Sequence, residues 1–168
     1  MVQFYFRIFC CDLIYNFSPQ ARAVQYIGFV NEMLERLGID YFDVFFIHNI
    51  NGPWLKNAKN ANTFEYIKKM KGNGIARQIG FSFHEKADLL KEVLDEYGDL
   101  FDIVQLELNY LDWEDPSIES HRCYDLCVEH GLDVYVMEPL KGGVIVNPSD
   151  EIKKDFKEFS PDKSIASL

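Results

Sequence analysis

Polar residues that can form hydrogen bonds or carry a proton follow apolar runs of this sequence. His48 follows the run 41–47. A short apolar strand that ends in a histidine places a titratable, hydrogen-bonding ring at the rim of a sheet. His48 is therefore predicted to belong to an active-site ring, and the alternative is a structural histidine whose hydrogen bonds are satisfied inside the fold.

Two further polar side chains lie in later apolar runs. Ser82 ends the run 75–82, and it either contributes its hydroxyl to a site or caps the next helix. Gln105 lies inside the run 102–108. A buried amide must be hydrogen-bonded, so Gln105 is expected to bond to a neighbouring strand or to a ligand.

A fourth apolar run, 132–138, ends in Met137 and Glu138 and leads into a glycine-containing loop. The loop reads Glu138-Pro139-Leu140-Lys141-Gly142-Gly143. Glycine lets a backbone approach a phosphate closely. The loop is therefore a candidate phosphate contact, and a plain turn would explain the same residues equally well.

The spacing of the runs indicates how these residues are positioned. The runs start at residues 41, 75, 102 and 132, so their starts lie 34, 27 and 30 residues apart. One βαβ unit takes about 30 residues. The four runs are thus predicted to be buried parallel strands.

Helical patterns fill the gaps between the runs. Helices are predicted over 18–37, 63–70, 85–97, 116–130 and 149–158, and a further one from residue 161. The stretch 49–62, with Trp54, is predicted to be the longest loop. Loops that follow the carboxyl ends of strands carry ligand contacts in α/β folds, so Trp54 hints at an aromatic wall there.

Alternating strands and helices imply an α/β fold with parallel strands and right-handed crossovers. A barrel and an open doubly wound sheet both fit this order. No Gly-x-Gly-x-x-Gly follows a strand, so a Rossmann-type nucleotide site has no support, and the barrel is favoured. In either fold the carboxyl ends of the strands share one face, where the polar residues would converge.

The composition excludes some partners. The chain has 168 residues and a formal net charge of −10, which argues against nucleic acid and against an anionic membrane surface. The apolar N-terminal run 2–12 is too short to span a bilayer and lacks the features of a signal peptide, so a strand is predicted. Cys123 and Cys127 share a helix face and are predicted to be buried free thiols rather than a metal pair, which fits a reducing cytoplasm.

Taken together, four segments resemble the aldo-keto reductase family. They are the run from Leu34 to His48, the run from Gly74 to Ser82, Val104-Gln105-Leu106-Glu107-Leu108-Asn109-Tyr110, and Met137-Glu138-Pro139-Leu140-Lys141-Gly142-Gly143. Each motif is weak alone, but the four occur in the family's order and spacing. The resemblance covers residues 18–168, with 1–17 a divergent N-terminal strand of the same single domain. It is nearest to a bacterial and archaeal branch whose full-length members often carry a C-terminal iron–sulphur segment.

The resemblance implies a (β/α)₈ TIM barrel and hydride transfer between NADPH or NADH and a small carbonyl substrate. It makes His48 the histidine of the family's Asp-Tyr-Lys-His tetrad and makes Ser82 and Gln105 the residues that hold the nicotinamide carboxamide. Met137 falls where many members stack a tyrosine on the nicotinamide ring. The residues that match the backbone near the pyrophosphate are Glu138, Leu140, Gly142 and Gly143. Phe83 stands where many members have an asparagine.

Only about five of the eight βα units have counterparts in this sequence. The family's Asp and Tyr lie far upstream of its histidine, and counting back to the position of its Lys reaches Leu13, Ile14 and Tyr15. Residues 164–168 resemble the start of a helix that precedes the segment discriminating NADP from NAD. We therefore expect a partial barrel with little or no reductase activity of its own, or a catalytically dead half-barrel that self-associates or pairs with another chain through its open sheet edges.

Overall fold

The computed structural model describes residues 8–11 and 19–164, with side chains from residue 28 onward. Five parallel strands form one sheet in the order β1-β2-β3-β4-β5. They are β1 (Ile8–Cys11), β2 (Phe42–Ile47), β3 (Ala76–Phe83), β4 (Ile103–Glu107) and β5 (Asp133–Met137). The last four strands correspond to the four predicted runs, and each begins one residue later than predicted. β1 lies within the predicted N-terminal strand.

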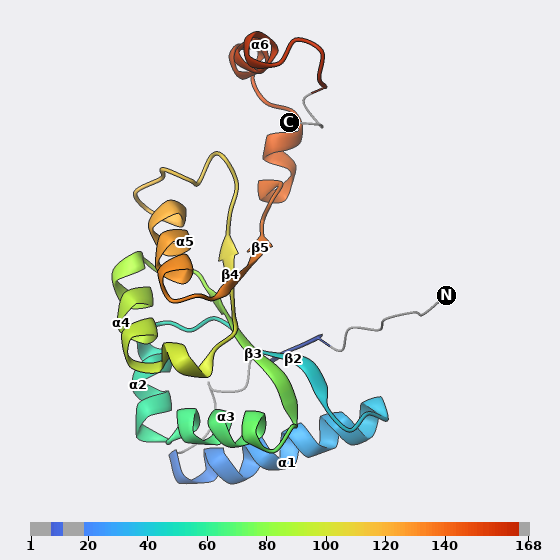
Figure 1. Cartoon of the computed structure of the whole chain (residues 1–168), viewed down its shortest axis with the longest axis vertical. Helices are drawn as coiled ribbons and strands as arrows, with labels where there is room; N and C mark the ends of the chain where they lie inside the picture. The colour runs from blue at the N-terminus through green and yellow to red at the C-terminus, as the bar shows by residue number, and fades with distance from the viewer. Residues whose placement is uncertain (1–7, 12–18, 165–168) are drawn as a thin grey trace.

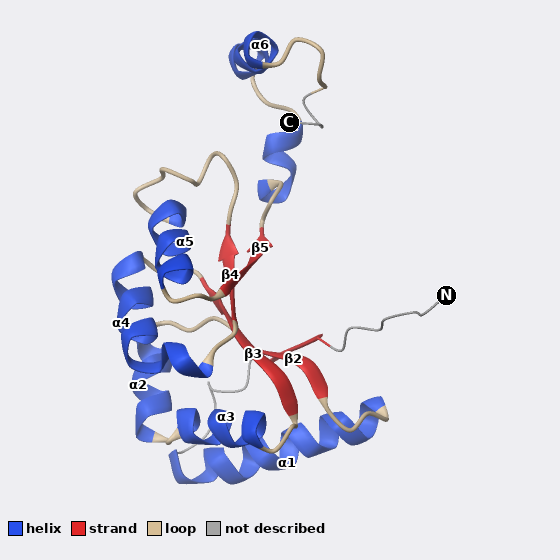
Figure 2. Ribbon diagram, viewed as in Figure 1, coloured by secondary structure: helices blue, strands red, loops and turns tan. Residues whose placement is uncertain are grey.

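Helices connect the strands in the order that the sequence indicates. They are α1 (Pro19–Leu37), α2 (Gly52–Asn60), α3 (Thr63–Gly72), α4 (Ala87–Tyr97), α5 (Ser120–Glu129) and α6 (Asp150–Phe159), with short 3₁₀ turns at η1 (Gly98–Leu100) and η2 (Lys141–Val146). Figure 1 shows α1 to α5 gathered on one side of the sheet, while no described helix covers its other side. In Figure 2, η2 and α6 extend beyond the carboxyl ends of β4 and β5.

The core lies between the sheet and the helices. Alternate strand residues such as Phe45, Ile79 and Val104 are fully buried there, against residues of the helices such as Ile67 and Leu90. Side chains of successive strand residues point to opposite faces. The intervening residues therefore lie on the face without helices, and the face with helices carries most of the buried apolar surface.

Several predictions about local structure are wrong, and the first concerns the stretch 49–62. The predicted loop 49–62 contains α2, because the Asn51 side chain accepts a hydrogen bond from the Trp54 amide at 2.9 Å and caps the helix. Trp54 is only 3% exposed and packs edge-on against Phe64 in the core, with ring centroids 5.8 Å apart. It thus cannot form the aromatic wall of a site.

The predicted helix from residue 161 is also wrong over the described residues, because 161–164 form a turn and bend. Residues 116–119 are not helical either, and Glu119 adopts a left-handed φ of 57° just before α5. The strand 132–138 was predicted to be buried, but β5 is the last strand of the described sheet and all its residues are partly or largely exposed. Val136, for example, is 51% exposed.

A carboxylate connects α3 to the sheet near the amino ends of the strands. The Asp102 carboxylate, just before β4, accepts a hydrogen bond from the Ile79 amide at 2.8 Å. It also forms an ion pair with Lys71 at 2.7 Å. The pair is about one third exposed, so screening by solvent limits its strength. Its main effect is to fix where β4 starts beside β3.

Among the described helices, none has the length and apolar character needed to cross a membrane.

Candidate active site

Three predicted site residues form a row across adjacent strands. Ser82 pairs with Gln105, and Gln105 pairs with Tyr135. Phe46 pairs with Gly80, so His48, two residues further along, is level with Ser82. The structure thus brings His48, Ser82 and Gln105 to the same level near the carboxyl ends of β2, β3 and β4.

The row lies on the face of the sheet that no described helix covers. Phe81, Phe83, Val104 and Leu106 are buried on the helix side, so the alternation of the strands places Ser82 and Gln105 on the opposite face. His48 follows the same alternation, because Phe45 and Ile47 belong to the helix-side core while Val44 and Phe46 form a separate cluster.

The peptide after His48 is hydrogen-bonded to the end of β3. The Asn49 amide donates to the Ser82 hydroxyl at 2.8 Å, and the Ile50 amide donates to the Ser82 carbonyl at 3.0 Å. The Ser82 hydroxyl accepts one bond here and keeps its own proton to donate to a second group. Ser82 does not cap the next helix, whose N-cap position is Lys86, so that alternative is wrong.

An aromatic pair packs on the same face of the sheet as the row. Phe46 lies over Gly80, where an added Cβ would be 2.7 Å from the Phe46 ring and 3.0 Å from the Ile103 carbonyl oxygen. On the far side, Phe46 and Tyr135 have ring centroids 5.8 Å apart. Gly80 is therefore needed for the close packing of Phe46, and the two tilted aromatic rings lie on the same face of the sheet as Ser82 and Gln105.

The chemistry of the row suits a small planar polar group. A neutral imidazole, a hydroxyl and a carboxamide each donate and accept hydrogen bonds. His48 and Gln105 are partly buried, and Ser82 is 2% exposed. An amide or carbonyl group held among these three side chains would meet several donors and acceptors.

The turn after β5 adopts an unusual backbone conformation. Lys141, Gly142 and Gly143 have consecutive positive φ values of 43°, 60° and 93°. The Gly142 amide donates to the Glu138 carboxylate at 3.1 Å, and the Gly143 amide donates to the Leu140 carbonyl at 2.8 Å. Glycine adopts this conformation readily, whereas it costs Lys141 free energy.

The predicted residues of this segment lie apart from the row along the next strand. Met137 pairs with Glu107 at the end of β5, two residues beyond the level of Gln105. Leu140 is 55% exposed. The structure thus places Met137 on the neighbouring strand, just past the level of the row, and Glu138, Leu140, Gly142 and Gly143 follow it in the turn that leaves the carboxyl end of β5. Figure 1 shows the chain continuing from β5 away from the sheet at this end.

Asp112, in the loop between β4 and α5, is a residue that sequence reasoning missed. Its carboxylate is 1% exposed, accepts a hydrogen bond from Asn109 at 2.6 Å, and pairs with Lys141. Burial opposes ionisation of Asp112, but the bonds from Lys141 and Asn109 outweigh it and lower its pKa. The sequence signal that could have indicated Asp112 is the Asn-x-x-Asp spacing, because the Asn109 side-chain oxygen also accepts a hydrogen bond from the Asp112 backbone amide at 3.0 Å.

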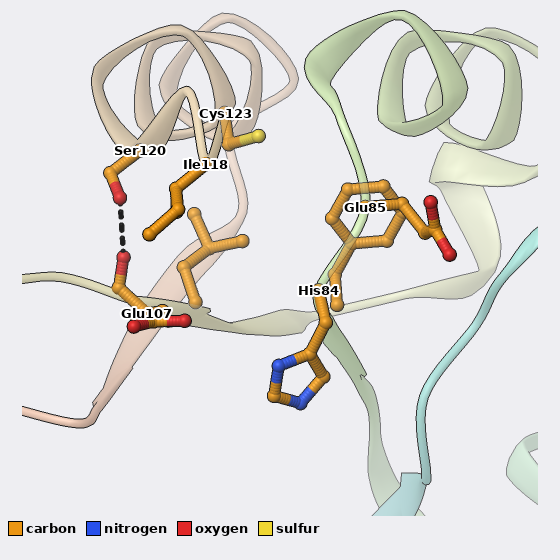
Figure 3. A pocket seen from close by; sticks show the side chains of 8 residues that line it. His84, Glu85, Glu107, Ile118, Ser120 and Cys123 are labelled. Carbon is orange, nitrogen blue, oxygen red and sulfur yellow. Dashed lines mark hydrogen bonds between the residues drawn. The ribbon is translucent and has the colours of Figure 1, made fainter. Parts of the chain in front are cut away.

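A small hollow lies on the helix side, between the ends of β3 and β4 and the start of α5. It has about 380 Å³ of open space, including its mouth. Figure 3 shows Ile118 and Cys123 reaching into it, while His84 is directed away from Cys123. The Ser120 hydroxyl donates to the Glu107 carbonyl at 2.7 Å and ties α5 to β4.

The cysteines of α5 confirm the prediction of buried free thiols. Burial raises the pKa of Cys123 to about 11 and that of Cys127 to about 12, so neither is a nucleophile at neutral pH. Within residues 8–11 and 19–164, no group of three His, Cys, Asp or Glu side chains is arranged to hold a metal ion.

Comparison with known proteins assigns the chain to a family. Residues 11–165 match the family described as "Aldo/keto reductase family". This chain therefore belongs to the aldo/keto reductase family, whose members are NAD(P)-dependent oxidoreductases. The chain is 32% identical over 134 residues to the NADH-specific methylglyoxal reductase of Escherichia coli, which covers 80% of this chain and 37% of the relative. It is 25% identical over 138 residues to the glyoxal reductase of Bacillus subtilis, covering 80% of this chain and 44% of the relative.

Solved structures of the family share the fold. Aldo-keto reductase AKR11C1 from Bacillus halodurans matches with a TM-score of 0.60 and 24% identity, over 80% of this chain and 42% of that protein. A Gox0644 mutant in complex with NADPH matches with a TM-score of 0.62 and 18% identity, over 91% of this chain and 51% of that protein. The chain spans roughly two fifths of the length of the curated relatives that it matches. The prediction of a partial (β/α)₈ barrel is therefore confirmed.

Proposed function

We propose that this chain supplies the nicotinamide-binding side of an NAD(P)H-dependent reductase that acts on small carbonyl compounds. The observation that carries the proposal is the row of His48, Ser82 and Gln105 on the uncovered face of the sheet. In this role Ser82 and Gln105 hydrogen-bond to the carboxamide of the nicotinamide, and His48 orients the carbonyl oxygen of the substrate. The cofactor, when bound, supplies the hydride.

The residues present suit such a ligand. A carboxamide needs one acceptor and one donor in its plane, and the paired Ser82 and Gln105 side chains offer both. Met137 lies beside them at the end of β5 and provides a soft apolar contact for a ring. We infer that the pyrophosphate contacts the backbone of the turn 138–143, which contains Glu138, Leu140, Gly142 and Gly143.

The substrate class that we propose is small dicarbonyl compounds, by analogy with the relatives named methylglyoxal reductase and glyoxal reductase. The E. coli relative is named as NADH-specific, whereas the Gox0644 structure contains NADPH. Both nucleotides therefore belong in any test. We also propose a cytoplasmic location, because free buried thiols at Cys123 and Cys127 suit a reducing compartment.

Nucleotide binding by the 168-residue chain tests the proposal. Titration with NADPH and with NADH, followed by the fluorescence of the reduced nicotinamide, should give saturable binding to at least one of them. One lost hydrogen bond is worth about 1 kcal/mol, so Ser82→Ala and Gln105→Leu should each weaken that binding about five-fold. Gln78→Leu is the matched control, since Gln78 lies on the same strand face four residues before Ser82 and should leave affinity unchanged.

Reductase activity is a separate question. A carbonyl reductase needs a proton donor beside the substrate oxygen, and we infer from the family resemblance that the tetrad Tyr and Lys have no counterpart in these 168 residues. We expect methylglyoxal reduction by this chain alone to be at or near background. NADPH-dependent turnover that His48→Ala abolishes would overturn this expectation.

A second candidate function is pairing with another chain. The observation that favours it is the exposed edge at β5, where Val136 is 51% exposed, together with the uncovered sheet face. Open parallel edges promote association between chains. Sedimentation velocity should then show species larger than a 19.6 kDa monomer, whereas a monomer that melts in one sharp two-state transition would contradict this candidate.

A further inference from the structure

Contacts between two separate loops converge on the turn after β5. Asp112 lies in the loop between β4 and α5, and Lys141 lies in the turn after β5, 29 residues further along the chain. The Lys141 ammonium pairs with the buried Asp112 carboxylate and lies 3.4 Å from a Glu107 carboxylate oxygen. Two acidic groups thus share one lysine.

A third residue strengthens the same connection. The Asn109 amide nitrogen donates to Asp112 at 2.6 Å and to the Glu138 carbonyl at 3.2 Å. The Asn109 carbonyl oxygen accepts the backbone amide of Asp112 at 3.0 Å. Asn109 therefore shapes its own loop and also reaches the first residue of the turn.

These contacts stabilise a conformation that the turn would not hold unaided. Glu138 and Lys141 are not glycines, yet their φ values are 53° and 43°. Side chains disfavour the left-handed region. Because Asn109 holds the carbonyl of Glu138 and Asp112 holds the side chain of Lys141, both unfavourable residues are fixed by the loop after β4.

We propose that Asp112 and Lys141 form a latch that holds the turn 138–143 in the shape required for binding the diphosphate of a nicotinamide dinucleotide. The inference rests on the proposed function for its ligand and on the contacts above for its mechanism. Asp112 and Lys141 are positioning residues, and neither contacts the reacting atoms. Lys141 is already neutralised by two carboxylates, so it acts by fixing the backbone of Gly142 and Gly143 and not as a free cation for phosphate.

The sign of one substitution separates these two roles of Lys141. If Lys141 were a phosphate-binding cation, Asp112→Asn would release it and tighten the binding of NADPH. If Lys141 is part of a latch, Asp112→Asn loosens the turn and weakens NADPH binding, with an expected loss of about ten-fold. Lys141→Met should cause a similar loss, and Lys141→Arg should restore most of the affinity because it keeps the ion pair.

Hydrogen–deuterium exchange on the same variants tests the latch without any ligand. Asp112→Asn and Lys141→Met should accelerate exchange of the Gly142 and Gly143 amides, and Lys141→Arg should not. Lys153→Met is the matched control, because Lys153 forms an exposed ion pair with Asp150 on α6 and its loss should change neither exchange in the turn nor affinity. Circular dichroism establishes that each variant is folded.

The outcomes distinguish the latch from the proposed function. Unchanged exchange at Gly142 and Gly143 in both Asp112→Asn and Lys141→Met would overturn the latch, whatever the nucleotide does. Faster exchange with unchanged or tighter NADPH binding would overturn the positioning role. If the wild-type chain binds neither NADPH nor NADH, the proposed function fails and the positioning role fails with it, while the exchange data still decide the latch.

Discussion

Gly80 offers a sharp test of how the candidate site is supported. An alanine Cβ at this position would lie 2.7 Å from one carbon of the Phe46 ring and 3.0 Å from the Ile103 carbonyl oxygen. The first contact is shorter than carbon atoms tolerate, and the second involves backbone that cannot rotate away. Gly80→Ala is therefore expected to displace Phe46 and strain the pairing of β3 with β4.

The expected cost follows from similar overpacked cores. Inserting one methyl group into a closely packed site costs about 1–3 kcal/mol of the free energy of unfolding. For a chain of this size that corresponds to a decrease in Tm of about 2–12 °C. Urea unfolding monitored by circular dichroism, with the midpoint and slope fitted separately, measures the change.

A double-mutant cycle tests whether the Phe46 ring is the cause. Phe46→Leu removes the clashing atoms, so Gly80→Ala should cost about 1 kcal/mol less in that background than in wild type. The control is Gly28→Ala on α1, where an added Cβ meets no atom within 4 Å and helix propensity predicts a gain of about 0.5–1 kcal/mol. Gly80→Ala without loss of stability, or costs that simply add in the double mutant, would refute the packing described for this face.

Three further predictions concern other parts of the fold. Asn51→Ala removes the cap of α2 and should lower the free energy of unfolding by about 1 kcal/mol, and a change below about 0.3 kcal/mol in urea unfolding would argue against the cap. Burial raises the thiol pKa of Cys123 to about 11 and that of Cys127 to about 12. Both thiols should therefore resist iodoacetamide at pH 7.5 until urea unfolds the chain, which peptide mass spectrometry would measure. Rapid labelling of the folded chain would contradict this. Because Lys141 and Asn109 hold the pKa of Asp112 below its ordinary value against the effect of burial, its ionisation stabilises the fold above about pH 4 and that stability is lost as the pH falls below it. Asp112→Asn should therefore flatten the decrease in stability as the pH falls below about 4, and an identical acid profile in the two proteins would count against the ion pair.

The strand order and the row at the strand ends were predictable because they depend on local pattern. Apolar runs about 30 residues apart with helical patterns between them specify parallel βα units. Once the strands are parallel, their carboxyl ends must share an edge. The convergence of His48, Ser82 and Gln105 therefore follows from their positions in the runs.

The errors share a physical cause, which is contact between distant segments. Trp54 stands in a polar stretch typical of a loop, but the side-chain cap of Asn51 starts a helix and turns Trp54 towards Phe64 in the core. The partner of Asp112 lies 29 residues away, so spacing within its own loop could indicate a turn but not an ion pair. The exposure of β5 depends on its position at the end of the sheet, which its apolar sequence does not reveal.

The location of bound nucleotide shows whether the face of the sheet without helices binds nicotinamide. Amide chemical shifts of the labelled chain would be followed by NMR as NADPH is added. We expect the largest changes at Asn49, Ser82 and Gln105, beside the face of the sheet without helices, and at Gly142 and Gly143 in the turn after β5. Changes confined to the helix-side residues, or none at millimolar NADPH, would contradict the assignment of this face as the nicotinamide-binding side of a reductase.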